Sequence, residues 1–243
     1  MIDVVFLPSQ MDAGRLPGAQ VVVLDILRAT STIVTALANR AKEVRLFADI
    51  ESAVAAKGGV VGPVLLAGER GCVKVEGFDC GNSPAEYAVH KVGNATILLT
   101  TTNGTVAAVA AQAARRMLIG SLLNSAATAK ALLKEINATD TLLVCAGTNG
   151  QVSCEDIIGA GAILFQIMQQ TYNPSLPFTD RAWIAYHAFA GVRQKLGAAL
   201  RLGAGGINLI EAGLEDDIDL CAQLDAVPVV VGLEREPLRA VRV

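Results

Sequence analysis

Short apolar runs alternate with segments of helical periodicity along the 243-residue chain. Runs of strand length, rich in Val, Ile and Leu, occupy 2–7, 20–26, 43–47, 63–67, 95–100, 116–120, 140–146 and 226–232. Between them the pattern predicts helices over 31–40, 50–57, 84–90, 105–115, 125–136, 155–171, 180–196 and 206–223. Near-continuous apolar strands are typical of sheets covered on both faces. The sequence therefore predicts a three-layer α/β/α sandwich with a mainly parallel or mixed sheet.

No compositional boundary divides the chain, so we expect one domain over 1–243. The tripeptide Thr-Asn-Gly occurs at 102–104 and again at 148–150. This repeat suggests an internal duplication into two similar halves, with a boundary near 120–140. The glycine-rich stretch 203–206 is predicted to be a linker or a mobile loop.

Composition narrows the classes of protein. Hydrophobic residues make up 52% of the chain, enough for a sizeable core. A net charge of −3 gives no electrostatic footprint for nucleic acid or for an anionic membrane surface. No apolar run approaches the roughly 20 residues of a membrane helix. The first residues lack a basic segment and a small-residue cleavage site, which favours a cytoplasmic location.

Residue types that bind metals also restrict the chemistry. The five cysteines include no C-x-x-C pair, so reduced thiols are expected. Only two histidines are present, which disfavours a histidine-rich zinc site. Any metal should therefore be a hard cation bound by oxygen atoms. The phosphate-binding motif G-x-x-x-x-G-K-[ST] is absent as well.

The segment 95–105 ends an apolar run in hydroxyls, an amide and a glycine, just before a predicted helix. Thr101, Thr102 and Asn103 can donate to an anion, and Gly104 allows close approach of the backbone. Thr148, Asn149 and Gly150 repeat the arrangement after the run 140–146. The alternative is a strand-to-helix turn with an Asn-Gly bend and a threonine cap.

The segment 21–32 places an acid and a base after another apolar run. Asp25 can hold a hard cation, and Arg28 can bind phosphate oxygens through two N–H groups. Thr30 can contact a substrate or cap the following helix. A structural Asp–Arg pair is the alternative interpretation.

The long loop 68–84 is rich in charged side chains. Glu69 and Asp79 are candidate metal ligands, Arg70 is a candidate anion ligand, and Asn82 lies beside a predicted helix start. Loops of this length often carry function. A solvated surface loop remains the alternative.

Two further acidic segments have competing interpretations. Glu155 and Asp156 follow the second Thr-Asn-Gly loop and are candidate bases or metal ligands, but acidic residues in a first helical turn also stabilise a helix by themselves. The motifs Ser83-Pro-Ala-Glu86 and Ser153-Cys-Glu-Asp156 match helix caps. The acidic run 215–219 is predicted to begin a solvated helix, with the alternative that one member reaches a metal. The apolar helix 180–196, which holds the only Trp, is predicted to pack in the core or in an oligomer interface.

Together these segments resemble the 2-phosphosulfolactate phosphatase family (ComB-type). The resemblance rests on Asp25-Ile-Leu-Arg28-Ala-Thr30, Gly68-Glu69, Gly77 to Pro84, Thr100 to Thr105, Cys145 to Gly161, Asp219-Leu-Cys221 and Val227-Pro228. It implies an α/β/α enzyme of coenzyme M biosynthesis that uses Mg²⁺ to hydrolyse 2-phosphosulfolactate to sulfolactate and phosphate.

The hypothesis for the site assigns magnesium to Asp25, Glu69 and Asp79. Arg28 and the loop Thr100 to Gly104 then bind the phosphate, and Glu155 or Asp156 is the base or a further ligand. Thr30, Arg70, Asn82 and the loop 148–150 are assigned to the substrate. The expected partner is a phosphorylated hydroxy acid, with no nucleic acid or membrane, and a homo-oligomer is expected. The alternatives are a phosphatase of another 2-phospho-hydroxy acid and a non-catalytic module that binds phosphate or carboxylate.

Overall fold

In the computed structural model, which describes residues 1–171 and 175–243, ten strands pair into one sheet. Their order across the sheet is β1-β8-β2-β7-β9-β10-β3-β6-β4-β5. The bounds are β1 (Ile2–Val5), β2 (Ala19–Leu24), β3 (Glu43–Phe47), β4 (Val64–Arg70), β5 (Val73–Lys74), β6 (Thr96–Thr100), β7 (Arg116–Gly120), β8 (Asp140–Cys145), β9 (Val231–Glu234) and β10 (Arg239–Arg242).

The sheet contains two parallel blocks. Strands β1, β8, β2 and β7 form one block, and β3, β6 and β4 form the other. Between them the three pairings β7–β9, β9–β10 and β10–β3 are antiparallel, so the two blocks have opposite senses within the sheet. The predicted mixed, mainly parallel sheet is therefore confirmed.

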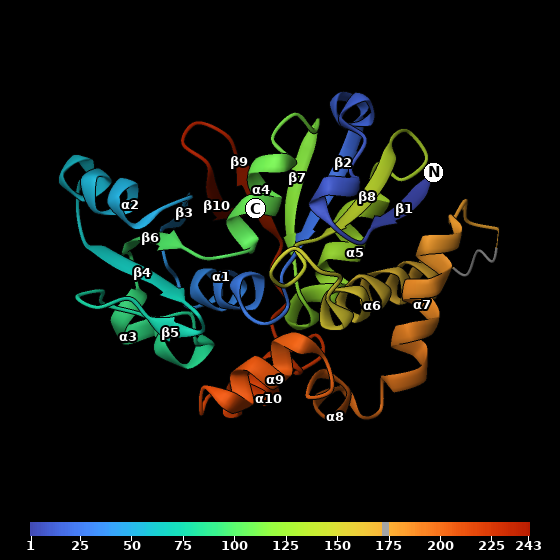
Figure 1. The fold of residues 1–243 in the computed structure, drawn as a ribbon. Coiled ribbons are helices and arrows are strands. Elements are labelled where there is room, and N and C mark those ends of the chain that lie inside the picture. Colours follow the sequence, from blue (N-terminus) through green and yellow to red (C-terminus); the bar gives the residue numbers. More distant parts are fainter. Residues whose placement is uncertain (172–174) are drawn as a thin grey trace.

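The two blocks nevertheless bring their carboxyl ends together. In Figure 1, β4 and β6 lie across the direction of β2 and β7. The helix α4 (Gly104–Ala110), which follows β6, contacts β2. The end of β6 thus lies beside the end of β2, where ligands commonly bind in α/β proteins.

Helices cover both faces of the sheet. The remaining helices are α1 (Ala29–Ala38), α2 (Ile50–Ala56), α3 (Val89–Val92), α5 (Ser125–Leu133), α6 (Cys154–Thr171), α7 (Asp180–Val192), α8 (Leu196–Leu200), α9 (Ala204–Glu211) and α10 (Asp216–Cys221). Along β2, Val21 and Val23 pack in a core with α1 and α4, whereas Val22 and Leu24 pack in a second core with α5, α6 and α7. This alternation confirms the three-layer α/β/α arrangement.

Several predicted elements differ from the structure. Strand β9 begins only at Val231, and β5 and β10 were not predicted. The predicted helix 84–90 is a 3-10 turn, Pro84–Glu86, followed by the short α3, and the predicted helix 206–223 is interrupted between α9 and α10. The stretch 203–206 is neither a linker nor a mobile loop, because it begins α9 and its Gly205 and Gly206 are buried.

The helix with the only Trp packs as predicted. Ala182, Ala185 and Phe189 of α7 are buried in the core shared with α6. Ile184 is exposed, and the oligomer interface stays a prediction. Among the described residues, no helix combines the length and the apolar character needed to cross a membrane.

Candidate active site

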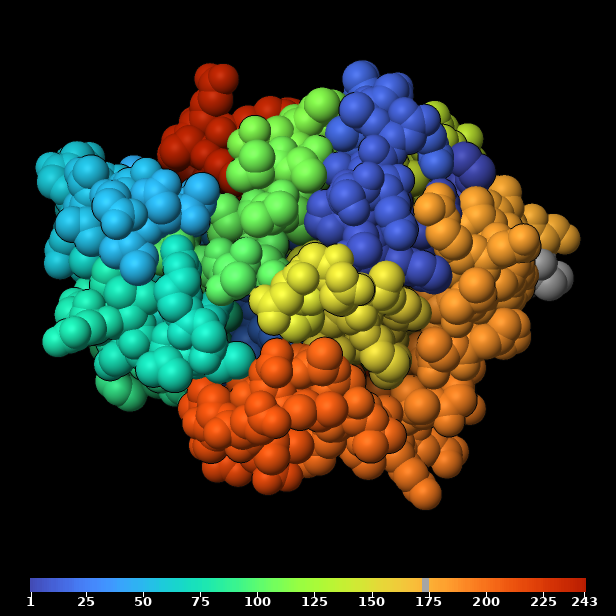
Figure 2. Space-filling model, in the orientation of Figure 1, coloured from blue at the N-terminus to red at the C-terminus, as the bar shows by residue number. Residues whose placement is uncertain are grey.

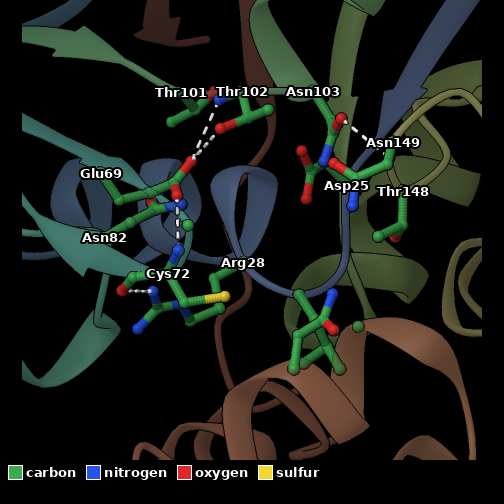
Figure 3. Close-up of a pocket in the computed structure, with 14 residues that line it drawn as sticks. Asp25, Arg28, Glu69, Cys72, Asn82, Thr101, Thr102, Asn103, Thr148 and Asn149 are labelled. Atoms are coloured by element: carbon green, nitrogen blue, oxygen red, sulfur yellow. Dashed lines mark hydrogen bonds between the residues drawn. The ribbon is translucent and has the colours of Figure 1, made fainter. Parts of the chain in front are cut away.

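A cavity of ≈ 100 Å³ opens where four segments of the chain meet (Figure 2), in the region of residues 70, 100, 150 and 205. Its charged lining residues are Asp25, Arg28 and Glu69. The other lining residues, among those the structure describes, are small, polar or apolar: Leu27, Gly71, Cys72, Asn82, Thr101, Thr102, Asn103, Thr148, Asn149, Gly205 and Asn208. Ten of these fourteen residues are labelled in Figure 3.

Asp25 lies just beyond the carboxyl end of β2 and is buried. Its Oδ1 accepts a hydrogen bond from the amide of Ala29 at 3.3 Å. Burial, together with the nearby Glu69 and Glu155 carboxylates, raises the pKa of Asp25 to about 7. A carboxylate in this setting favours a proton or a cation as its partner.

Two more carboxylates lie behind the cavity, in the first turn of α6. Both oxygens of Asp156 accept backbone hydrogen bonds, from Ile26 at 2.8 Å and from Gly147 at 3.0 Å. Burial, with Asp25 and Glu155 close by, holds the pKa of Asp156 well above its ordinary value. Asp156 thus joins the loops after β2 and β8, and it does not line the cavity. The structure does not place it as a base.

Glu155 differs from Asp156 in keeping one oxygen unused. Its Oε1 accepts a hydrogen bond from Gly205 at 3.1 Å, whereas its buried Oε2 has no hydrogen-bond partner among the described residues. Capping alone therefore does not account for either acidic residue, because both bind backbone amides of other segments. Glu155, like Asp156, does not line the cavity, but of the two candidate bases only Glu155 has a buried carboxylate oxygen without a hydrogen-bond partner among the described residues.

Glu69, at the end of β4, holds two loops of the cavity together. Its Oε1 accepts from both the amide and the hydroxyl of Thr102 at 3.0 Å, and its Oε2 accepts from the amide of Cys72 at 2.9 Å (Figure 3). These bonds occupy both oxygens. Glu69 is thus placed in the cavity as predicted, and its contacts are those of a loop tether.

Arg28 is almost fully buried, with 4% of its surface exposed. Its Nη1 donates to Oδ2 of Asp217 at 2.5 Å, and its Nη2 donates to the carbonyl of Cys72 at 2.8 Å. Arg28 therefore pairs with Asp217, whereas the alternative interpretation of the sequence was a structural pair with Asp25. The other N–H groups of the guanidinium remain available to a ligand.

The two Thr-Asn-Gly loops meet at the cavity. The amide of Asn149 donates to Oδ1 of Asn103 at 3.4 Å (Figure 3). Gly104 lies against Asp25, since a Cβ at this position would come within 2.9 Å of Oδ2. Gly150, by contrast, has a positive φ of 74° and does not line the cavity. The predicted convergence of the loops is observed, with Gly150 serving the turn.

Seven predicted site residues are not among those that line the cavity: Thr30, Arg70, Asp79, Gly104, Gly150, Glu155 and Asp156. The exposed Asp79 accepts at Oδ2 from the amide of Leu66 at 2.8 Å, so it secures β4 instead of joining Asp25 and Glu69. The exposed Arg70 donates to the hydroxyl of Thr100 at 3.0 Å. Thr30 is buried and donates to the carbonyl of Asp25 at 2.9 Å. The assignment of Asp79 to a metal stays a prediction, which its place outside the cavity lining does not support.

Part of the site was not predicted from the sequence. Gly205 and Asn208 of α9 line the cavity, and Asp217 of α10 holds Arg28. The run 215–219 is not wholly a solvated helix start, because Asp217 is 4% exposed. Ser83 also departs from its predicted capping role, since its hydroxyl donates to Oδ1 of Asp217 at 2.5 Å. The acidic run was the only signal, and its partners lie far away in the sequence.

The charges of the site bear on its fit to a divalent cation. The lining holds two carboxylates and one guanidinium, and that guanidinium is already paired with Asp217. Among the described residues, no three His, Cys, Asp or Glu side chains are arranged to hold a metal alone. Mg²⁺ commonly binds through one or two carboxylates, water and substrate phosphate. The raised pKa of Asp25 and the unpaired Oε2 of Glu155 fit a cation of this kind.

Comparison with known proteins gives one consistent family. Residues 5–236 match the family model described as 2-phosphosulpholactate phosphatase. A protein of Caldanaerobacter subterraneus subsp. tengcongensis named "probable 2-phosphosulfolactate phosphatase" is 40% identical over 220 residues, covering 90% of this chain and 89% of that protein. Proteins with the same name from Symbiobacterium thermophilum (39% over 221 residues, 90% and 92% covered) and Thermotoga maritima (38% over 233 residues, 96% and 95% covered) are also similar. The chain belongs to the 2-phosphosulfolactate phosphatase family.

Proposed function

We propose that this chain is a cytoplasmic, magnesium-dependent phosphatase that hydrolyses 2-phosphosulfolactate to sulfolactate and phosphate, as in coenzyme M biosynthesis. The observation that carries the proposal is the presence of Asp25 and Arg28 in one cavity, beside the hydroxyls and amides of the two Thr-Asn-Gly loops. A carboxylate for a cation and a guanidinium for phosphate are the groups that this hydrolysis needs. The family membership and the names of the relatives support the same substrate.

The charge of the cavity supports the proposed magnesium. A substrate with phosphate, carboxylate and sulfonate groups carries several negative charges, and the lining adds those of Asp25 and Glu69. Arg28 alone does not offset them, because Asp217 already neutralises it. Mg²⁺ would supply positive charge beside the phosphate when bound. Asp25 is the residue we assign to it, with substrate oxygens and water completing the coordination.

The chain's own residues then have separate tasks. Arg28 donates to the phosphate oxygens, and Thr101 and Asn103 of the cavity lining offer further donors. Asn82 and Asn208 present amides to the part of the substrate that carries the other acidic groups. Glu155 is the candidate that accepts a proton, because its Oε2 is unpaired. Electrostatic positioning of this kind supplies much of the catalysis in phosphate ester hydrolysis.

The test is release of inorganic phosphate from 2-phosphosulfolactate with Mg²⁺ and with excess chelator. We expect turnover only with the metal, and we expect Asp25→Asn to abolish most of it in a folded protein. Binding of phosphate without any turnover would support a non-catalytic module instead. A panel of 2-phospho-hydroxy acids in the same assay identifies the preferred substrate. The homo-oligomer that we also propose is checked by light scattering.

A further inference from the structure

The buried side chain of Asp217 joins three distant segments at the edge of the cavity. It belongs to α10, yet its Oδ2 accepts from Arg28, 189 positions earlier, and its Oδ1 accepts from the hydroxyl of Ser83, both at 2.5 Å. Arg28 and Asp217 are each 4% exposed. The pair is therefore shielded from solvent, unlike the exposed Asp219 on the same helix, which pairs with Arg201.

The contacts around Arg28 fix the plane of its guanidinium. Nη1 is held by Asp217 and Nη2 by the carbonyl of Cys72, which are two contacts from different segments. An arginine side chain has many rotamers, and two anchored nitrogens leave few of them. The remaining N–H groups are then presented to the cavity in one orientation.

A second contact docks the same C-terminal segment on the site. The amide of Gly205 in α9 donates to the buried Glu155, and Gly205 and Asn208 both line the cavity. Helix α10 also packs against α9 and against the turn Pro84–Glu86. Gly205 and Asn208 thus contribute to the cavity lining, and Asp217 is the point where the same segment contacts Arg28.

We propose that Asp217 is a positioning residue, which sets the orientation of Arg28 for the phosphate group and acts only through that arginine. The inference rests on the proposed function for its activity assay. Neutralising the arginine would be a sufficient role for any nearby acid, but the hydroxyl of Ser83 also fixes the Asp217 carboxylate. A carboxylate that only balanced the charge of Arg28 would not need this second anchor. A carboxylate that orients Arg28 does need it, because it must itself be held in place.

The main test compares Asp217→Asn with Asp219→Asn, which removes the same charge from the same helix at an exposed position. We expect Asp217→Asn to lower kcat/KM for 2-phosphosulfolactate by roughly tenfold or more, since small misplacements of a binding group cost rate steeply. Asp219→Asn should stay within about twofold. Ser83→Ala, which removes only the second anchor, should lower kcat/KM by an intermediate factor and remain folded. Unchanged kinetics in folded Asp217→Asn and Ser83→Ala overturn the proposal.

A double-mutant cycle separates positioning from general destabilisation. If Asp217 acts through Arg28, adding Asp217→Asn to Arg28→Lys should cost little beyond Arg28→Lys alone. If the loss in kcat/KM of the double variant instead equals the product of the two single losses, Asp217 acts independently of Arg28, which would contradict the proposal. The melting temperature of each variant is measured alongside, and an activity loss that disappears on cooling also counts against it.

Binding of inorganic phosphate gives a readout that does not depend on the substrate. We expect Asp217→Asn, and to a lesser degree Ser83→Ala, to weaken phosphate binding in the presence of Mg²⁺, measured by calorimetry, whereas Asp219→Asn leaves it unchanged. If the parent chain fails to hydrolyse 2-phosphosulfolactate but this pattern holds, the proposed function fails and the role of Asp217 stands. Tighter phosphate binding by Asp217→Asn would mean that the aspartate only neutralises charge, and would overturn the proposal.

Discussion

The carboxylate of Glu155 and the backbone of Gly205 are in direct contact within the protein. The amide of Gly205 donates to Oε1 of Glu155 at 3.1 Å, and a Cβ at position 205 would overlap the same oxygen. A Cβ at Gly203 would overlap Oε2. Any side chain at position 203 or 205 would therefore collide with the Glu155 carboxylate. Glycine at both positions lets the start of α9 pack directly against this buried acid.

Gly205→Ala should therefore displace either Glu155 or the start of α9. Overpacking of this kind typically costs about 1–3 kcal/mol of stability. Since Gly205 also lines the cavity, we expect phosphatase activity to fall as well. Urea unfolding and the phosphate-release assay measure the two effects.

Gly191→Ala is the matched control, because an added Cβ there meets no atom within 4 Å and the residue lies in α7. It should leave activity unchanged and stability equal or slightly higher. Equal stability of Gly205→Ala and Gly191→Ala would show that the contact with Glu155 adjusts without cost.

Glu69→Gln tests the tether between the two loops. An amide can accept from Thr102 with its oxygen, but its NH₂ group would then face the amide of Cys72, which is also a donor. Leaving this donor unsatisfied should lower the free energy of unfolding by about 1–3 kcal/mol. Urea denaturation measures this loss.

Thr102→Val serves as the reference, because it removes one of the three hydrogen bonds to Glu69 and leaves the backbone bonds intact. We expect a smaller loss of stability than with Glu69→Gln. If Glu69→Gln weakens magnesium binding at unchanged stability, the residue is a metal ligand and the tether is secondary.

Much of the fold could be predicted from local pattern. The predicted strand 116–120 matches the observed bounds of β7, because four consecutive buried residues, Met117 to Gly120, between polar flanks allow few alternatives. The short strand β10 was missed, since its sequence, Arg239 to Arg242, is half charged and sits at the end of the chain. What makes this segment a strand is its pairing with β3 and β9, which depends on the tertiary fold and not on the local sequence.

The site residues likewise fall into those that the local sequence pattern predicts and those that it does not. Asp25, Arg28 and the two threonine loops were predicted because each follows an apolar run, and strand ends gather ligands. Asp217 could not be found by that rule, because its partner lies 189 positions away and nothing in its own segment marks it as buried. Asp79 shows the opposite limit, since sharing a loop with Glu69 does not fix the direction of its side chain, which lies outside the cavity lining.

Asp79→Asn should accordingly leave magnesium-dependent activity within about twofold of the parent chain. The amide oxygen of Asn can still accept from Leu66, so stability should also change little. Kinetics over a range of Mg²⁺ concentrations check this expectation. If Asp79→Asn instead needs a tenfold higher Mg²⁺ concentration for half-maximal activity, Asp79 is a metal ligand.

The raised pKa of Asp25 predicts a pH dependence of stability in the metal-free protein. The folded chain keeps this proton up to about pH 7, whereas the unfolded chain loses it near 3.8. Stability should therefore fall as pH rises from about 4 to about 7, by on the order of a few kcal/mol. Asp25→Asn has no such proton, so it should melt above the parent chain at pH 8, with a smaller difference at pH 5. Adding Mg²⁺ at pH 8 should stabilise the parent chain and not Asp25→Asn. If the metal-free parent chain melts at a higher temperature than Asp25→Asn at pH 8, the raised pKa of Asp25 does not govern stability.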